Sequence, residues 1–197
     1  MEAQDDYFVN LFTPLYKILS ELRCACSALG IRQPIVLNYQ DGELADINPD
    51  KIVSEILAVI SQLRPQIMIS FGEDGLSGHP DHIAIGRYAL EAFNQTKDVN
   101  AFYALAVPQS IVDVLNMTQI KPVQDSSITH IVDVVEAWND KMAAIRCHRT
   151  QMDESPILMG KKQKQFLFLG KEHFRLIAFR KNYESDDLMK WLGKYCL

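Results

Sequence analysis

The chain has 197 residues, 48% hydrophobic and 23% charged, with a formal net charge of -5, which is typical of one globular domain and excludes a disordered chain. The acidic balance argues against nucleic acid as a partner, because phosphate backbones are bound by clustered lysine and arginine. No apolar run reaches the roughly 20 residues that cross a bilayer, and the acidic N-terminus lacks the basic start of a signal peptide, so we expect a cytoplasmic protein without a membrane partner.

Helical and strand-like patterns alternate along the chain. Apolar residues recur at spacings of three and four from Leu11 to Leu29, which predicts a helix with Gly30 as its C-cap and Pro14 as an alternative start. The apolar run Pro34–Tyr39 predicts a buried strand. Asn48-Pro49 predicts the start of a second helix, which Pro65 ends.

The later elements follow the same alternation. In chain order they are a strand over Gln66–Phe71, a helix over Asp81–Asn94, a strand over Ala101–Val107, a helix over Pro108–Asn116, a strand over Thr129–Val135, a helix from Trp138 to Arg146, an ambiguous segment over Pro156–Leu169, a strand over His173–Arg180 and a short amphipathic helix in Lys181–Leu197. Strands alternating with helices predict a single α/β domain, Rossmann-like and three-layered, with a mostly parallel sheet.

Four cysteines are present: Cys24, Cys26, Cys147 and Cys196. The first two are two positions apart on the predicted helix and therefore point to different faces. Because no CxxC pair exists, a thiolate zinc site or a thioredoxin-like motif is disfavoured. We expect free, partly buried thiols in a reducing compartment.

The loop from Phe71 to His82 carries the chemistry. It follows a predicted buried strand, opens a predicted helix and contains the only close histidine pair, His79 and His82. In open α/β sheets, ligands bind at the carboxyl ends of strands. The positive end of the next helix favours neutral imidazole, the form that binds metals, and Asp81 is placed to orient a histidine. The alternative is simple helix capping, with both histidines merely exposed.

The segment Ser70–Gly86, with its Gly-His-Pro-Asp-His core, resembles the second signature of the LmbE/PIG-L family of zinc-dependent N-acetylglucosaminyl deacetylases. Weaker likenesses lie in Glu21–Ala25, Asn38–Gly42, Ala144–Gln151 and Glu172–Leu176. The resemblance implies a domain over residues 21–180, preceded by an unrelated segment over 1–20 and followed by a tail over 181–197.

The resemblance implies a zinc-dependent hydrolase that removes acetate from an N-acetylated amino sugar or glycoconjugate. It assigns His82 as a metal ligand and His79 as the general acid or electrophile near the tetrahedral intermediate, with Asp81 tuning His79. In such chemistry zinc lowers the pKa of its water while an imidazolium stabilises the developing oxyanion.

The chain departs from the family at one essential motif. The family's other two metal ligands and its general base come from an N-terminal His-Pro-Asp-Asp-Glu motif, whereas the nearest text here is Gln4-Asp-Asp-Tyr7. We therefore expect the family's first strand to be missing, through a shortened or rearranged gene product or an alternative start. The competing hypothesis is a degenerate member without catalysis, acting as a binding or interaction protein or as an inactive fragment.

Other residues have both a functional and an ordinary interpretation. Asp74 and Ser77 are candidate substrate contacts, although loop capping explains them equally well, and Ser77 as a nucleophile paired with His79 lacks a Gly-x-Ser-x-Gly elbow. His148 is a candidate for the substrate cleft, but a histidine that bonds a carbonyl at a helix end is the favoured interpretation. For His130 and His173, structural or surface roles are favoured. For Trp138 and Trp191, core or interface roles are favoured.

Overall fold

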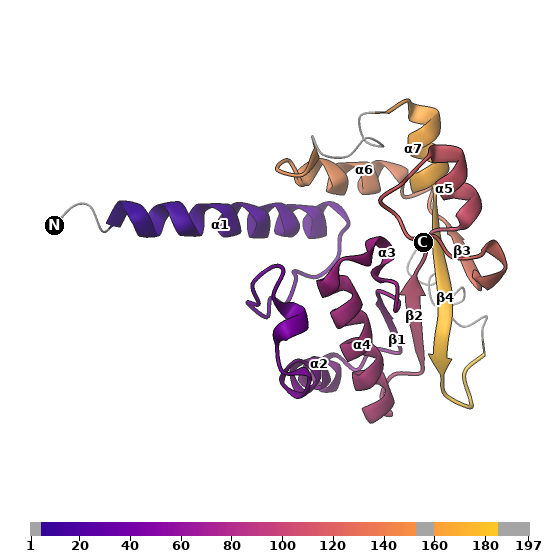
Figure 1. The fold of residues 1–197 in the computed structure, drawn as a ribbon, viewed down its shortest axis with the longest axis horizontal. Helices are drawn as coiled ribbons and strands as arrows, with labels where there is room; N and C mark the ends of the chain where they lie inside the picture. Colours follow the sequence, from indigo (N-terminus) through magenta and orange to yellow (C-terminus); the bar gives the residue numbers. More distant parts are fainter. Residues whose placement is uncertain (1–4, 153–159, 185–197) are drawn as a thin grey trace. The chain divides into compact units, whose positions relative to one another are not determined.

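The computed structural model describes residues 5–152 and 160–184, with side chains described from residue 16 onward. The predicted helix in Lys181–Leu197 therefore falls largely outside the described residues, as do Trp191 and Cys196. The chain divides into two compact units, one formed by Met1–Leu37 with Asp133–Gly170 and the other by Asn38–Val132 with Lys171–Leu197. Their elements are labelled in Figure 1.

The second unit is built on a four-stranded sheet in the order β1-β2-β4-β3. β1 and β2 are parallel, with Ile67 opposite Ala101, whereas β2 and β4 are antiparallel. The strands are β1 (Ile67–Ser70), β2 (Ala101–Leu105), β3 (His130–Asp133) and β4 (Lys171–Phe179). The predicted α/β, Rossmann-like class is confirmed, and the sheet is mixed.

Three helices of the second unit follow the predicted boundaries within one or two residues: α2 (Pro49–Leu63), α4 (Pro80–Gln95) and α5 (Gln109–Leu115). The sequence did not predict the short helix α3 (Gly75–Gly78) or the 3-10 turns η1 (Leu44–Asp46) and η2 (Asp125–Ser127). Asn48 caps α2 by accepting a hydrogen bond from the Asp50 amide at 3.0 Å, and Arg64 ends it in the left-handed conformation just before Pro65. The cap and breaker signals were therefore interpreted correctly.

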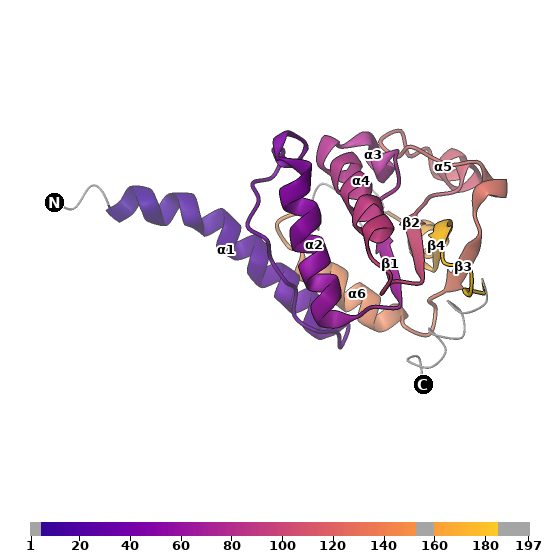
Figure 2. The same ribbon diagram turned by 90° about the horizontal axis from the view of Figure 1, so that it is seen from below.

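The core of this unit lies between the sheet and two helices. Figure 2 shows α2 and α4 on the same side of β1 and β2. The buried members of this cluster come from α2, α4 and β2, among them Ile52, Ala92, Phe93 and Phe102. On the opposite face of β2, Ala101 and Tyr103 pack with Phe174. Burial of β2 on both faces explains why its sequence is a continuous apolar run.

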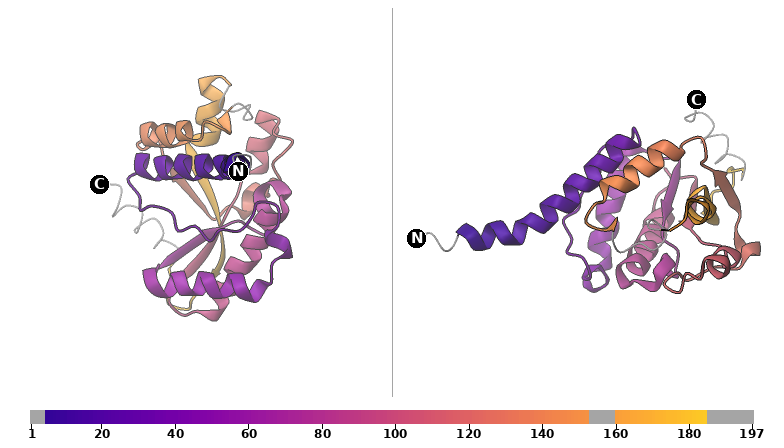
Figure 3. Two further views of the ribbon diagram at one scale, coloured as in Figure 1. Left: turned by 90° about the vertical axis from the view of Figure 1, so that its left-hand side faces the viewer. Right: turned by 90° about the horizontal axis from the view of Figure 1, so that it is seen from above.

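The first unit is helical. It contains α1 (Asp5–Ala28), α6 (Trp138–Cys147) and α7 (Lys162–Leu169), and α1 packs along α6 (Figure 3). Gly30, with φ +65°, completes the end of α1 as predicted, since its amide bonds the Ser27 carbonyl. The alternative start at Pro14 is wrong, because the helix begins at Asp5.

Two predictions for the first 40 residues are wrong. Pro34–Tyr39 contains no strand, and Ile35 is 53% exposed. Asn38 has φ +58°, which breaks an extended conformation, and an apolar run forms a strand only where a neighbour pairs with its backbone. The expectation of free thiols is also wrong for Cys24 and Cys147, which form a disulfide between α1 and α6. Cys26 is free and buried, as expected.

None of the described helices is both long and apolar enough to cross a bilayer.

Candidate functional site

The histidine loop leaves β1 at Ser70 and enters α4 at Pro80. It therefore lies at the carboxyl end of a parallel strand, where the sequence predicted it. Within it the short helix α3 brings the Gly75 carbonyl back toward the start of α4. The loop places His79 at the N-cap of α4 and His82 in its first turn.

His82 is held on two sides. Its ring stacks on Phe71 with centroids 4.0 Å apart and planes 6° from parallel. Its Nδ1 lies 3.1 Å from the Gly75 carbonyl oxygen. A carbonyl only accepts hydrogen bonds, so Nδ1 carries the proton and the neutral ring keeps its lone pair on Nε2. This is the arrangement that second partners give to metal-binding histidines.

His79 has the opposite tautomer. Its Nδ1 accepts a hydrogen bond from the Asp81 backbone amide at 3.2 Å, which is the N-cap bond of α4. An amide nitrogen only donates, so the proton of the neutral ring lies on Nε2. The two rings are 5.1 Å apart. The loop therefore presents a nitrogen lone pair on His82 and an N–H donor on His79.

The loop backbone is strained at Leu76. This residue has φ 62° and ψ -40°, a conformation that side-chain-bearing residues rarely adopt. Its amide donates to Asp74 Oδ1 at 2.7 Å, and its carbonyl accepts from the Lys121 amide at 2.8 Å. Strain that the surroundings enforce from both sides is common at binding and catalytic sites.

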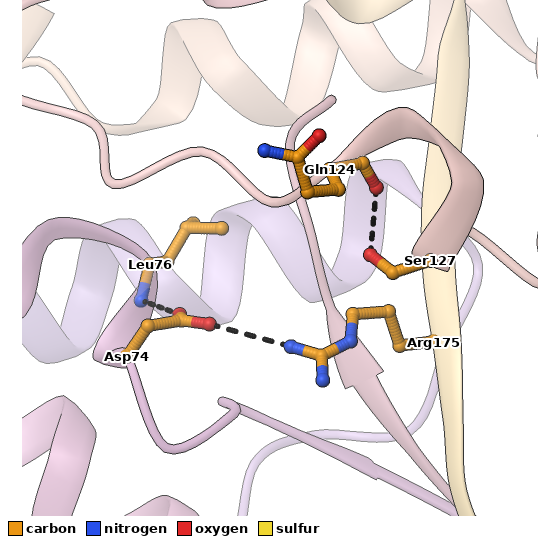
Figure 4. Close-up of polar contacts among 5 residues, drawn as sticks. All are labelled: Asp74, Leu76, Gln124, Ser127 and Arg175. Atoms are coloured by element: carbon orange, nitrogen blue, oxygen red, sulfur yellow. Dashed lines mark hydrogen bonds and ion pairs between the residues drawn. The ribbon is translucent and has the colours of Figure 1, made fainter. Parts of the chain in front are cut away.

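Asp74 also connects the loop to the sheet. Its Oδ2 lies 3.7 Å from the Arg175 guanidinium of β4, as Figure 4 shows. The same figure shows the Ser127 hydroxyl of η2 donating a hydrogen bond to the carbonyl of Gln124, the residue just before η2. Asp74 therefore has the loop-capping role, and its predicted contact with substrate stays a prediction.

Asp81 does not form the expected carboxylate–histidine pair. Both carboxylate oxygens accept backbone N–H bonds, from Gly42 at 2.7 Å and from Leu44 at 3.1 Å, and the residue is only 9% exposed. A negative charge in the first turn of α4 is also favoured by the helix dipole. Asp81 fixes the 42–44 segment to the helix start, so the capping alternative describes its contacts, and its catalytic role stays a prediction.

The substitution D81A is expected to lower the free energy of unfolding by about 1–3 kcal/mol, because it leaves two half-buried amides without their acceptor. D81N should lose less, since one amide oxygen still accepts. Urea unfolding of both variants measures the difference. D46A, which changes an exposed carboxylate of η1, serves as the control and should stay within about 0.5 kcal/mol. Equal stability of D81A and the unsubstituted chain would contradict the role of Asp81 as the acceptor for these two amides.

Gly86 allows α4 to approach the loop closely. A Cβ at this position would lie 2.7 Å from the Phe71 carbonyl oxygen and 2.9 Å from that of Gly72. Both are backbone atoms at the exit of β1 and cannot move without shifting the loop. The absence of a side chain therefore sets the distance between the helix and the histidine loop.

The substitution G86A is expected to destabilise the chain by about 1–3 kcal/mol through this overpacking, although alanine is the better helix former. Thermal unfolding measures the effect. The control E91A lies on the exposed side of α4 and should change stability by less than about 0.5 kcal/mol. A stabilised G86A variant would show that the close approach is not required.

The remaining predicted residues have these positions. The Ser77 hydroxyl lies 3.4 Å from His82 Nδ1, so it contacts that ring and does not pair with the ring of His79. His148 is the C-cap residue of α6 in the first unit, and its predicted place in a substrate cleft stays a prediction. His130 is buried against Thr129 and Tyr103, and burial lowers the pKa of the half-buried His173.

The sequence placed Phe71 in the loop but did not indicate that its ring stacks on His82, and it did not indicate Lys121 or Arg175 as parts of the site. Lys121 lies so close to Gly78 that a Cβ there would be 2.6 Å from Nζ. Lys121 and Arg175 come from other segments, and no spacing rule connects them to the histidines.

His82 fits a metal as a single ligand, through its open Nε2. A catalytic zinc site requires three protein ligands and a water. Within residues 5–152 and 160–184, no group of three or more histidine, cysteine or acidic side chains could hold a metal ion. The described part of the chain thus offers one suitable ligand and not a complete set.

A small cavity of about 140 Å³ lies behind the loop, between α4 and β4. Phe71 and Gly72 line one side, and the guanidinium groups of Arg87 and Arg175 line another. Pockets for drug-sized ligands typically measure about 300–1,000 Å³. This cavity is therefore too small to enclose a whole sugar substrate.

Comparison with known proteins gives a family and a set of relatives. Residues 17–93 match the family model PIG-L, described as GlcNAc-PI de-N-acetylase. A 1D-myo-inositol 2-acetamido-2-deoxy-alpha-D-glucopyranoside deacetylase of Acidothermus cellulolyticus is 32% identical, over 68% of this chain and 58% of its own length. An enzyme with the same name from Thermobifida fusca is 27% identical, over 68% of this chain and 61% of its own length. Another, from Geodermatophilus obscurus, is 27% identical, over 88% of this chain and 76% of its own length. The chain thus spans about 60% of the first two relatives.

Proposed function

Since the chain belongs to the PIG-L family through residues 17–93, we propose that its histidine loop forms half of a metal-dependent site that removes acetate from an acetamido sugar. The observation that carries this proposal is the opposite tautomers of the two histidines. His82 presents a lone pair and His79 an N–H donor, 5.1 Å apart between ring centroids. The names of the relatives support a glucosamine-type substrate linked to inositol.

The proposed metal is zinc, with His82 as one of its ligands. When bound, zinc supplies a Lewis acid and a water of lowered pKa. His82 Nδ1–H donates to the Gly75 carbonyl oxygen, which fixes the ring plane, and stacking on Phe71 restricts its rotation. Stiff support of this kind lowers the entropy lost when a ligand binds.

His79 is the proposed hydrogen-bond donor. In amide hydrolysis, water adds to the acetyl carbon, the carbon–nitrogen bond breaks, and the proton that the water gives up goes to the leaving amine. The Nε2–H of the neutral His79 ring is suited to stabilise the developing oxyanion by a hydrogen bond, and it keeps its proton in that step. Asp81 contributes by fixing the backbone amide that holds His79 Nδ1.

The proposal is tested on the purified chain after zinc loading and dialysis. Metal analysis should find about one zinc per chain, and acetate should be released from N-acetylglucosaminyl-inositol. A neutral sugar without an acetamido group serves as the substrate control. A chain that retains no stoichiometric zinc and releases no acetate would contradict catalysis.

The second candidate is a family member that binds the sugar without hydrolysing it. The observation in its favour is that the described residues contain no group of three metal ligands. It predicts saturable binding of N-acetylglucosaminyl-inositol without acetate release, whether or not zinc is added. Equilibrium dialysis beside the acetate assay separates the two candidates.

A further inference from the structure

The first unit contains a groove between α6 and α7 that the proposed function does not use. Its volume is about 580 Å³, within the range of about 300–1,000 Å³ common for small-molecule pockets. Its chemically informative lining residues come from both helices: Trp138, Asn139, Arg146, Lys162, Gln163 and Phe166. The groove therefore combines aromatic, amide and cationic side chains.

The aromatic end of the groove lies where the two helices meet. The rings of Trp138 and Phe166 are 5.3 Å apart between centroids and tilted by 46°. Phe166 is 49% exposed. Trp138 is half-buried. An aromatic contact with one ring this open to solvent offers an apolar surface to a ligand.

The cationic groups lie away from that contact along each helix. Arg146 follows Trp138 by eight residues on the same face of α6, about 12 Å along the axis, and Lys162 precedes Phe166 by one turn, about 6 Å. Neither cation has an acidic neighbour in the groove, since no carboxylate is among the described residues that line it. In a chain of net charge -5, the two cations that line this groove favour an anionic ligand.

We propose that this groove binds a phosphorylated sugar. The apolar face of the sugar ring stacks on Trp138, the amides of Asn139 and Gln163 bond its hydroxyl groups, and the phosphate lies between Arg146 and Lys162. Each of the three kinds of lining side chain thus corresponds to one part of the ligand. The inference is independent of the histidine loop and requires no metal.

The test uses glucose 1-phosphate as the probe and the fluorescence of Trp138 as the signal. The chain has two tryptophans, so a W191F background leaves Trp138 as the only one. We expect saturable binding with a Kd below about 1 mM, and binding of glucose or inorganic phosphate at least about tenfold weaker. R146Q and K162Q should each weaken binding about tenfold, because each loses a charge-assisted hydrogen bond.

K164Q is the matched control. It removes the same charge from α7, but Lys164 is exposed and does not line the groove, so its Kd should stay within about twofold. Circular dichroism confirms that each variant is folded, and equilibrium dialysis with labelled glucose 1-phosphate measures binding without the tryptophan signal. H82Q should leave this binding unchanged, which separates it from the proposed deacetylation.

Several results would overturn the proposal. These are the absence of saturation by glucose 1-phosphate, equally tight binding of glucose or phosphate alone, and an equal loss in K164Q and K162Q. Tighter binding of AMP than of glucose 1-phosphate would overturn the assignment to a sugar, because it would show that the aromatic end selects a nucleobase.

Discussion

Substitution of His82 by glutamine is expected to lower the affinity of the chain for zinc by more than about 100-fold, since the loss of even outer partners of a metal ligand costs about 10–100-fold. The reason is that His82 combines an Nε2 lone pair with an Nδ1 proton fixed on a backbone carbonyl. Competition against a chromophoric chelator measures the affinity. Acetate release, where present, should be lost with it.

H79A separates the two histidines. It keeps the ring of His82 and should keep zinc affinity within a few-fold, while turnover falls by about 100-fold or more because a hydrogen-bond donor to the oxyanion is lost. H173Q changes a histidine of β4 that is not part of the loop and should alter neither quantity. Unchanged zinc affinity in H82Q, or an equal loss in H173Q, would refute the assignment of His82 as a ligand.

Removal of the Cys24–Cys147 disulfide should produce the largest change in stability. The bridge closes a loop of 123 residues between α1 and α6. In the chain-entropy account, opening a loop of this length destabilises the folded state by about 2–5 kcal/mol. We expect the double variant C24A/C147A to show this loss in urea unfolding followed by Trp138 fluorescence in the W191F background, because Trp138 lies on α6.

Hydrogen bonds beside the disulfide should reinforce it. The Thr150 amide and hydroxyl both donate to Glu21 of α1, and the hydroxyl bond is the main reason that the pKa of Glu21 lies below its usual value. C26A, which removes the free buried thiol, is the control and should cost far less than the double variant. Four alkylated thiols in the unfolded, unreduced chain would show that the bridge is not formed.

Local patterns predicted most of the secondary structure because each depends on a few neighbouring residues. Asn48-Pro49 supplies its own cap, and Gly30 adopts a left-handed conformation that favours glycine. The apolar run Pro34–Tyr39 failed for the opposite reason, because a strand needs a partner that local sequence does not show. Pro14 did not mark the start of its helix, because a long helix with packing partners can contain a proline.

The histidine loop was identified from the sequence, whereas its chemistry was not. Gly-His-Pro-Asp-His indicated a ligand site at a strand end, and the spacing placed both histidines at the start of a helix. The tautomers depend on which backbone group each Nδ1 meets, and the fold supplies the Gly75 carbonyl of α3 to His82 and the Asp81 amide of α4 to His79. The partners of Asp81 lie 37 and 39 residues earlier in the chain, so no motif could reveal them.

The sequence by itself therefore determined the α/β class, most element boundaries and the location of the histidine pair, because helix caps, periodicity and glycine-rich turns are local. The tertiary structure decided the lone pair on His82, the N–H on His79, the backbone role of Asp81 and the Cys24–Cys147 bridge. The physical reason is that hydrogen bonds and disulfides select atoms by distance in space, and only the folded chain brings these atoms within bonding distance.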